Sequence, residues 1–144
     1  MSCSVDANLL IYAANAAARQ HQAADRFLTA LIDSEEPLCL AWGVLNAFLR
    51  ITTDGRIMSR PLTSREARGW LEDLINLPQT RLLSEESGFW NVLCSVAEPL
   101  NPRGPDVTDV HLAALLKQHG VRTLYSNDRG FRRFEFLKVV DPLR

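Results

Sequence analysis

Three aspartates are the residues of this sequence whose type and position indicate chemistry. Asp6 follows a strand candidate at residues 2–5, Asp128 follows another at 123–126, and Asp109 lies in a predicted first helical turn. Carboxylates brought together repel one another, which raises the proton affinity of at least one of them unless a cation neutralises the group. Magnesium binds one or two carboxylates together with waters and phosphate oxygens. If the fold brings these aspartates together, they form a metal site suited to phosphodiester hydrolysis.

Each aspartate also has a purely structural interpretation. Asp6, at the end of a strand, can cap the helix that follows it. Asp109 is favoured in a first helical turn by the helix dipole, with Asp106 as the alternative N-cap and Asp109 at position N3. Asp128 is followed by Arg129 and a glycine, which suits a turn. Position and residue type alone leave both interpretations open.

Short strand candidates alternate with amphipathic helices along the chain. Strands are expected at residues 2–5, 38–41, 81–83, 123–126 and 137–140. Apolar residues at helical spacing predict helices over 9–17, 24–31, 44–49 and 70–74, the last opened by a capping box at Thr63 and Glu66. Two further helices are expected, one from Ser84 onward and one from about 107 to 119, where Gly120 ends it.

This alternation predicts the fold class. Parallel neighbours need crossover connections, so strands alternating with helices imply an α/β fold with a mainly parallel sheet and helices on both faces. Ligands of such sheets bind beyond the carboxyl ends of the strands. Asp6 and Asp128 are predicted to lie at that edge.

Composition sets the size and setting of the protein. A chain of 144 residues with 47% apolar residues suits one core, so we expect a single domain over 1–144. Residues 1–6 contain no Lys or Arg, and Asp6 and Asn8 interrupt the apolar stretch, so neither a signal peptide nor a membrane span is expected. We expect a cytoplasmic protein whose cysteines, Cys3, Cys39 and Cys94, are buried thiols. With a net charge of −1, any affinity for RNA must be local.

Four segments, in order along the chain, resemble the motifs of VapC-type PIN-domain toxins. Residues 5–13, VDANLLIYA, resemble the first motif, with Asp and Asn at a strand-to-helix junction. Residues 42–50, WGVLNAFLR, resemble the second, and residues 107–114, VTDVHLAA, the third. Residues 125–131, YSNDRGF, resemble the fourth, in which an Asp precedes a basic residue and a Phe. The resemblance spans nearly the whole chain.

The resemblance implies a ribonuclease with a defined set of site residues. It implies a PIN-like three-layer α/β/α sandwich, Mg²⁺ or Mn²⁺ as cofactor, single-stranded or loop RNA as substrate, a homodimer, and a small VapB-like antitoxin whose tail occupies the groove of the active site. By carry-over, Asp6 and Asp109 hold the principal metal. Asp128 completes the acidic rim, which is the group of carboxylates around that metal. Asn8 orients Asp6 or a water of the metal. The supporting polar residues are Asn8, Asn46 and Asn127.

One position departs from the family pattern. The second motif usually carries a glutamate before the Phe-Leu-Arg string, and this chain has Ala47 there, preceded by Asn46. The rim then carries three negative charges instead of four, which disfavours tight binding of two metals before substrate arrives. Asp106 is the candidate for a supplementary acid. Gly130 also replaces an acidic residue frequently seen at its position.

Two other functions remain open. One is a PIN-fold protein that the missing glutamate has weakened catalytically and that retains binding to an antitoxin. The other is a phosphatase with an aspartate nucleophile after the first strand, but that mechanism needs a second Asp where this chain has Asn8.

Basic residues near the fourth motif are candidates for binding RNA. Arg129 and Arg132 are the candidates for phosphate contacts, because arginine pairs well with phosphate, and Arg133 follows them. A second arginine cluster occupies positions 56, 60, 65 and 68. His111, on the helix of Asp109, could act as an acid or base or have a structural role.

Overall fold

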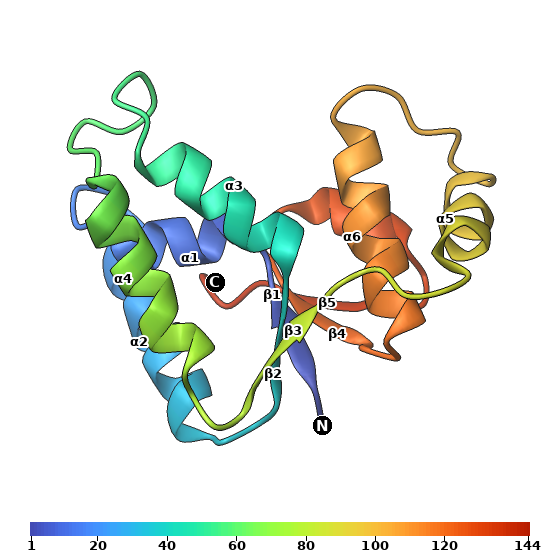
Figure 1. Ribbon diagram of the computed structural model, residues 1–144, viewed down its shortest axis with the longest axis horizontal. Coiled ribbons are helices and arrows are strands. Elements are labelled where there is room, and N and C mark those ends of the chain that lie inside the picture. The colour runs from blue at the N-terminus through green and yellow to red at the C-terminus, as the bar shows by residue number, and fades with distance from the viewer.

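A five-stranded parallel sheet with strand order β3-β2-β1-β4-β5 lies at the centre of the computed structural model, which describes residues 1–144 (Figure 1). The strands are β1 Cys3–Val5, β2 Leu38–Ala41, β3 Thr80–Leu83, β4 Thr123–Tyr125 and β5 Lys138–Val140. All four neighbouring pairs run parallel, and β1 pairs with both β2 and β4. The predicted strands are therefore confirmed to within one residue at each boundary.

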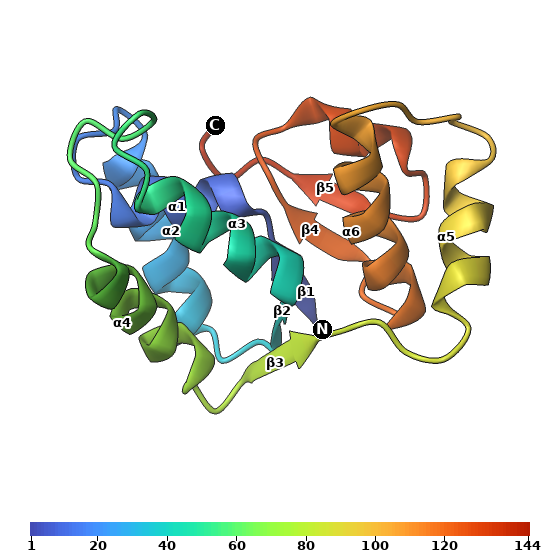
Figure 2. The same cartoon turned by 45° about the horizontal axis from the view of Figure 1, so that its top comes forward.

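Six α-helices and one short 3-10 helix connect the strands. They are α1 Ala7–Ala14, α2 His21–Asp33, α3 Trp42–Thr52, α4 Ser64–Ile75, α5 Phe89–Ala97, α6 Asp106–Gln118 and the 3-10 helix η1 Arg129–Arg133. Figures 1 and 2 show α1 to α4 on one face of the sheet and α5 with α6 on the other. The connection from β3 to β4 runs back across the sheet, and a right-handed crossover in that direction places its helices on the opposite face. The predicted three-layer α/β/α sandwich is confirmed.

Local signals in the sequence fix several of these boundaries. The Thr63 hydroxyl accepts from the Glu66 backbone, and the Glu66 carboxylate accepts from the Thr63 backbone, so the predicted capping box opens α4. Gly120 follows α6 with φ +71°, a left-handed conformation that glycine adopts without strain. None of the six α-helices is long and apolar enough to span a membrane.

Two helix boundaries differ from the prediction. The helix expected from Ser84 begins instead at Phe89, after Gly88 with φ +83°. The segment before it is held by α6, since the Glu86 backbone N–H donates to Gln118. The first helix ends at Ala14, so the predicted extension to residue 17 is wrong.

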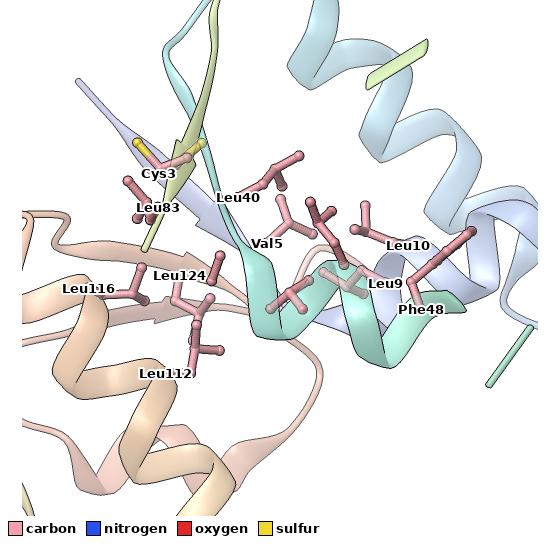
Figure 3. Packing of buried hydrophobic residues seen from close by; sticks show 14 of the residues in the cluster. Cys3, Val5, Leu9, Leu10, Leu40, Phe48, Leu83, Leu112, Leu116 and Leu124 are labelled. Atoms are coloured by element: carbon pink, nitrogen blue, oxygen red, sulfur yellow. The ribbon is translucent and has the colours of Figure 1, made fainter. Parts of the chain in front are cut away.

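The core lies on both faces of the sheet. It contains 33 buried apolar residues. Figure 3 shows Leu9, Leu10 and Phe48 on one side of the sheet and Leu112 and Leu116 of α6 on the other. This double layer fixes α1 and α6 against the central strands, and these are the elements that carry the candidate site.

The cysteines follow the prediction in two cases of three. Cys3 and Cys39 are buried, and burial raises the pKa of the Cys3 thiol to about 11, which keeps it protonated and unreactive. Cys94 is exposed on α5, contrary to the expectation of a buried thiol.

Candidate active site

Asp6 joins the central strand to the first helix. Its backbone N–H donates to Tyr125 O at 3.0 Å, which continues the β1–β4 pairing beyond Val5. Its Oδ1 accepts from the Ala7 backbone at 2.8 Å as the N-cap of α1, and its Oδ2 accepts from Ser126 Oγ at 2.9 Å. The capping role is therefore real, and it fixes the carboxylate at the carboxyl end of the sheet, where chemistry was predicted.

Ser126 links two of the three aspartates. Its buried hydroxyl donates to Asp6 and accepts from the Asp128 backbone N–H at 3.0 Å. Ser126 was not predicted as a site residue, because a serine at the end of a strand carries no chemical signal of its own. Its only signal was its place directly before Asn127 and Asp128 in the fourth motif.

Asp128 caps the short helix that follows β4. Its Oδ1 accepts from the Gly130 backbone at 2.8 Å, as the turn interpretation predicts. Its side chain is exposed, but its negative charge still raises the pKa values of both Asp6 and Asp109. Asp128 therefore belongs electrostatically to the same group of acids.

Asp109 lies one turn into α6 and meets an arginine from η1. The N-cap is Pro105 and the helix begins at Asp106, so the prediction of Asp106 as N-cap and Asp109 at N3 is wrong by one position. Arg133 Nη2 donates to Asp109 Oδ2 at 3.2 Å, and Nη1 donates to Asp106 Oδ1 at 3.4 Å. Arg133 was expected near the fourth motif, but its pairing with these two acids was not predicted.

One cavity brings the principal acids together. Asp6 and Asp109 both line a space of about 100 Å³ between α3 and α6. Ala47 and His111 line the same cavity, so Ala47 does lie where a glutamate would extend toward the acids. Two residues separated by more than a hundred positions in sequence thus converge on one site.

Burial and mutual repulsion perturb both carboxylates. The pKa of Asp6 is raised by its removal from water, and the charges of Asp128 and Asp109 raise it further, against the hydrogen bonds from Ser126 and Ala7. The pKa of Asp109 is raised by burial and by Asp128, and Arg133 opposes this shift. Raised pKa values at a shared cavity mark carboxylates that a cation would stabilise.

The donor set fits a hard divalent cation. No three His, Cys, Asp or Glu side chains lie close enough together to form a metal-binding group by themselves. Magnesium, however, takes only one or two carboxylates and completes its shell with waters and phosphate oxygens. Asp109 Oδ1 accepts no hydrogen bond from the protein, and each Asp6 oxygen accepts only one, so lone pairs remain free on both residues.

The three supporting asparagines are not brought to the acids by hydrogen bonds. Asn8 is exposed and makes no bond to Asp6, whose orientation comes from Ser126 instead. Asn46 lines a separate groove between α3 and α4, away from the cavity that its neighbour Ala47 lines. Asn127 is half-buried, and its side chain has no partner among the hydrogen bonds of the structure.

The remaining candidates have distinct surroundings. His111 Nε2 lies 2.8 Å from Glu85 Oε1, and its ring meets Phe89 edge-on, so it ties α6 to the segment before α5. Arg129 and Arg132 are exposed and form no ion pair, so their role in binding RNA stays a prediction.

Comparison with known proteins identifies the family. The sequence model of the PIN-domain family matches residues 4–137, a range that includes Asp6, Asp109 and Asp128. With its parallel α/β/α sandwich and converging aspartates, the chain belongs to the PIN-domain family.

Its relatives within that family are VapC ribonucleases by name. Ribonuclease VapC48 of Mycobacterium tuberculosis is 34% identical over 142 residues, which cover 99% of this chain and 98% of the relative. VapC ribonuclease Mb2897 of Mycobacterium bovis is 33% identical over 139 residues, covering 96% and 94%. The predicted resemblance to VapC-type PIN proteins is confirmed, and it leaves no support for the aspartate-nucleophile phosphatase.

Solved structures share the fold at lower identity. VapBC2 from Rickettsia felis, bound to a DNA fragment from its promoter, has a TM-score of 0.70 at 14% identity and covers 97% of this chain and 98% of its own. VapC20 of Mycobacterium tuberculosis, described as a sarcin-ricin loop cleaving toxin, has a TM-score of 0.66 at 17% identity, covering 91% and 93%.

Proposed function

We propose that this chain is a metal-dependent endoribonuclease that serves as the toxin of a toxin–antitoxin pair in the cytoplasm. The observation that carries the proposal is the meeting of Asp6 and Asp109 on one cavity at the carboxyl end of the sheet. Relatives that match almost the whole chain are named ribonucleases, which supports RNA as the substrate.

Asp6 and Asp109 would hold Mg²⁺ or Mn²⁺, with Asp128 completing the acidic rim. When bound, such an ion lowers the pKa of the attacking water and stabilises charge on the attacking and leaving oxygens. Ser126 keeps Asp6 in one orientation through its hydroxyl and fixes the backbone of Asp128. The acids are thus preorganised and need little rearrangement when the ion and the substrate bind.

Arg129 and Arg132 would bind the phosphates of RNA beside this rim. Both side chains are exposed and lack an acidic partner in the protein, so no ion pair has to break before they bind RNA. Because arginine donates two parallel hydrogen bonds to a phosphate, the pair would hold the strand on the side of η1.

The partner we propose is a small VapB-like antitoxin. Several solved structures with this fold are VapBC proteins, including VapBC-1 from nontypeable Haemophilus influenzae. An antitoxin tail carrying an arginine could reach the carboxylates of Asp6 and Asp109 in place of a metal. The homodimer stays a prediction, and light scattering on the purified chain would measure it.

The nuclease proposal is tested with the chain freed of any partner. Incubated with total RNA and Mg²⁺, the protein should cut RNA at mapped positions, and a chelator should stop the reaction. Asp6→Asn and Asp109→Asn should each reduce cleavage at least tenfold, since each removes a charged ligand while keeping the shape. Asp25→Asn on the exposed surface of α2 is the matched control and should cut at the wild-type rate. Full activity of Asp6→Asn would refute the assignment.

The same assay decides the alternative of a catalytically weakened binding protein. That alternative depends on Ala47 alone, whereas Asp6, Asp109 and Asp128 are all present. It predicts no cleavage by the purified chain at any concentration of Mg²⁺ or Mn²⁺, together with intact binding of the antitoxin.

The antitoxin proposal needs a separate experiment. Co-expression with the small gene adjacent to the one that encodes this chain should yield a stable complex with suppressed nuclease activity. If the two proteins purify apart, the toxin–antitoxin assignment is refuted, whatever the outcome of the RNA assay.

A further inference from the structure

Arg133 is the arginine that contacts the acids of the site from within the chain. Its two terminal nitrogens bind two different carboxylates, Asp109 at 3.2 Å and Asp106 at 3.4 Å. Asp106 and Asp109 lie three residues apart in the first turn of α6, and so on one side of the helix. One guanidinium therefore bridges η1 to the beginning of α6.

Arg133 is partly buried and packs against an aromatic ring. Its guanidinium carbon lies 5.1 Å from the centre of the Phe134 ring, and Phe134 is buried. Its Nε is buried and has no hydrogen-bond partner. An unpaired buried donor is destabilising, and the contacts of the two terminal nitrogens with carboxylates offset this cost.

We propose that Arg133 is a positioning residue of the nuclease site, which fixes the Asp109 carboxylate by bridging its Oδ2 to Asp106 and leaves Oδ1 free for the divalent cation. The inference rests on the proposed function, because it assumes a cation at Asp6 and Asp109. Asp106 is then an anchor for the arginine and does not bind the metal. Because Ala47 leaves the rim one acid short, the placement of Asp109 carries more of the cation's binding in this chain.

Arginine and lysine differ in a way that makes the proposal testable. The planar guanidinium directs separate nitrogens at two carboxylates, whereas the lysine ammonium is a point charge that cannot reproduce this geometry. Arg133→Lys therefore keeps the charge and loses the bridge, and Arg133→Gln loses both. If the bridge positions Asp109, both variants should bind Mg²⁺ about tenfold more weakly in a calorimetric titration, as is typical when a group that orients a metal ligand is removed.

Arg122 provides the matched control. It is exposed, makes no ion pair, and precedes β4, at the opposite end of the strand from Ser126. Arg122→Lys and Arg122→Gln should bind Mg²⁺ like the unchanged chain. Thermal melts without metal should show the Arg133 variants folded at the titration temperature, so that weaker binding reports the site.

Three results would overturn the proposal. If Arg133 acts through its charge alone, Arg133→Lys binds Mg²⁺ like wild type, and Arg133→Gln binds it more tightly. If Arg133 binds RNA phosphate, its variants raise the KM for RNA and leave Mg²⁺ affinity unchanged. If Asp106 is itself a metal ligand, Asp106→Asn weakens binding further in the Arg133→Lys background, whereas a bridge predicts no further loss.

The controls also separate this inference from the proposed function. Absence of Mg²⁺ and Mn²⁺ binding by the unchanged chain would refute the metal site and the inference together. If the unchanged chain binds Mg²⁺ and Asp109→Asn loses that binding while Arg133→Lys keeps it, only the role of Arg133 is refuted.

Discussion

Replacing Ala47 with Glu would add a third carboxylate to the cavity that Asp6 and Asp109 line. Ala47 is half-buried on α3 and lines this cavity of about 100 Å³. Gly43, one turn earlier on the same face, has nothing within 4 Å of an added Cβ, so this side of α3 has open space for a longer side chain. We expect the side chain introduced by Ala47→Glu to extend toward the acids and to tighten the binding of a divalent cation.

The magnitude follows from the added contact. A charge-assisted contact contributes about 1–3 kcal/mol, so Mg²⁺ should bind roughly 5- to 150-fold more tightly. With Mg²⁺ in excess over both dissociation constants, the same free energy is added to folding stability. For a domain near this size, 1 kcal/mol shifts the Tm by about 2–4 °C, so the shift caused by Mg²⁺ should be larger by about 2–12 °C in the variant. Without metal the variant should melt lower than wild type, because another carboxylate adds repulsion to Asp6 and Asp109.

Calorimetric titration of Mg²⁺ and paired melts, in chelator and in Mg²⁺, measure both effects. Asn46→Glu is the matched control, since it adds the same charge one residue away but into the groove between α3 and α4. An equal loss of stability with and without Mg²⁺ would mean that the carboxylate introduced at position 47 is buried without a partner. Unchanged affinity and an unchanged Tm would mean that position 47 does not face the acids, and would refute the reasoning.

Three further predictions concern the acids and the RNA surface. Because the pKa of Asp6 is raised in the fold, the metal-free protein should lose stability as the pH rises from the ordinary aspartate pKa through the raised value. Asp6→Asn should flatten this dependence and be more stable than wild type at neutral pH. Chemical denaturation at a series of pH values measures both effects. Ser126→Ala should destabilise the fold by about 1–3 kcal/mol in denaturant titrations and slow RNA cleavage, since it leaves Asp6 Oδ2 and the Asp128 N–H without their partner; an unchanged rate would show that this link is not needed for activity. Replacing Arg129 and Arg132 with Gln should reduce the slope of log affinity for single-stranded RNA against log salt by about 0.7 for each phosphate that is no longer neutralised, and an unchanged slope would exclude them from the RNA surface.

The sequence predicted the strands better than the helix boundaries, for a physical reason. Each strand is a short segment bounded by residues that interrupt it, such as Pro37 before β2, and this signal is local. The start of α5 is set by contacts with residues that are distant in the sequence. Ser84 was a reasonable N-cap, but the acids that follow it are held by α6, with Glu85 bonded to His111 and Glu86 bonded to Gln118. These tertiary contacts hold that segment out of the helix, and they could not be predicted from local sequence patterns.

The candidate site was also predicted only in part. Asp6 and Asp109 could be predicted because carboxylates at strand ends and helix starts are informative by type and position. Ser126 and Arg133 could not, because a serine and an arginine are common residues whose importance here comes from the side chain that each meets. The structure places Asn46 in the groove between α3 and α4 and its neighbour Ala47 in the cavity of the acids. Helical phase read from the sequence did not decide which of the two faced the acids.

The pairing of β1 with β4 also bears on how the protein is made. The hydroxyl of Ser126 and the carboxylate of Asp6 that it holds are 120 residues apart, so Asp6 is synthesised long before the serine that orients it. A nascent chain on the ribosome carries Asp6 early but neither Asp109 nor the serine that orients Asp6. For a protein proposed to attack RNA, the site can therefore assemble only after residues 109 and 126 have been synthesised.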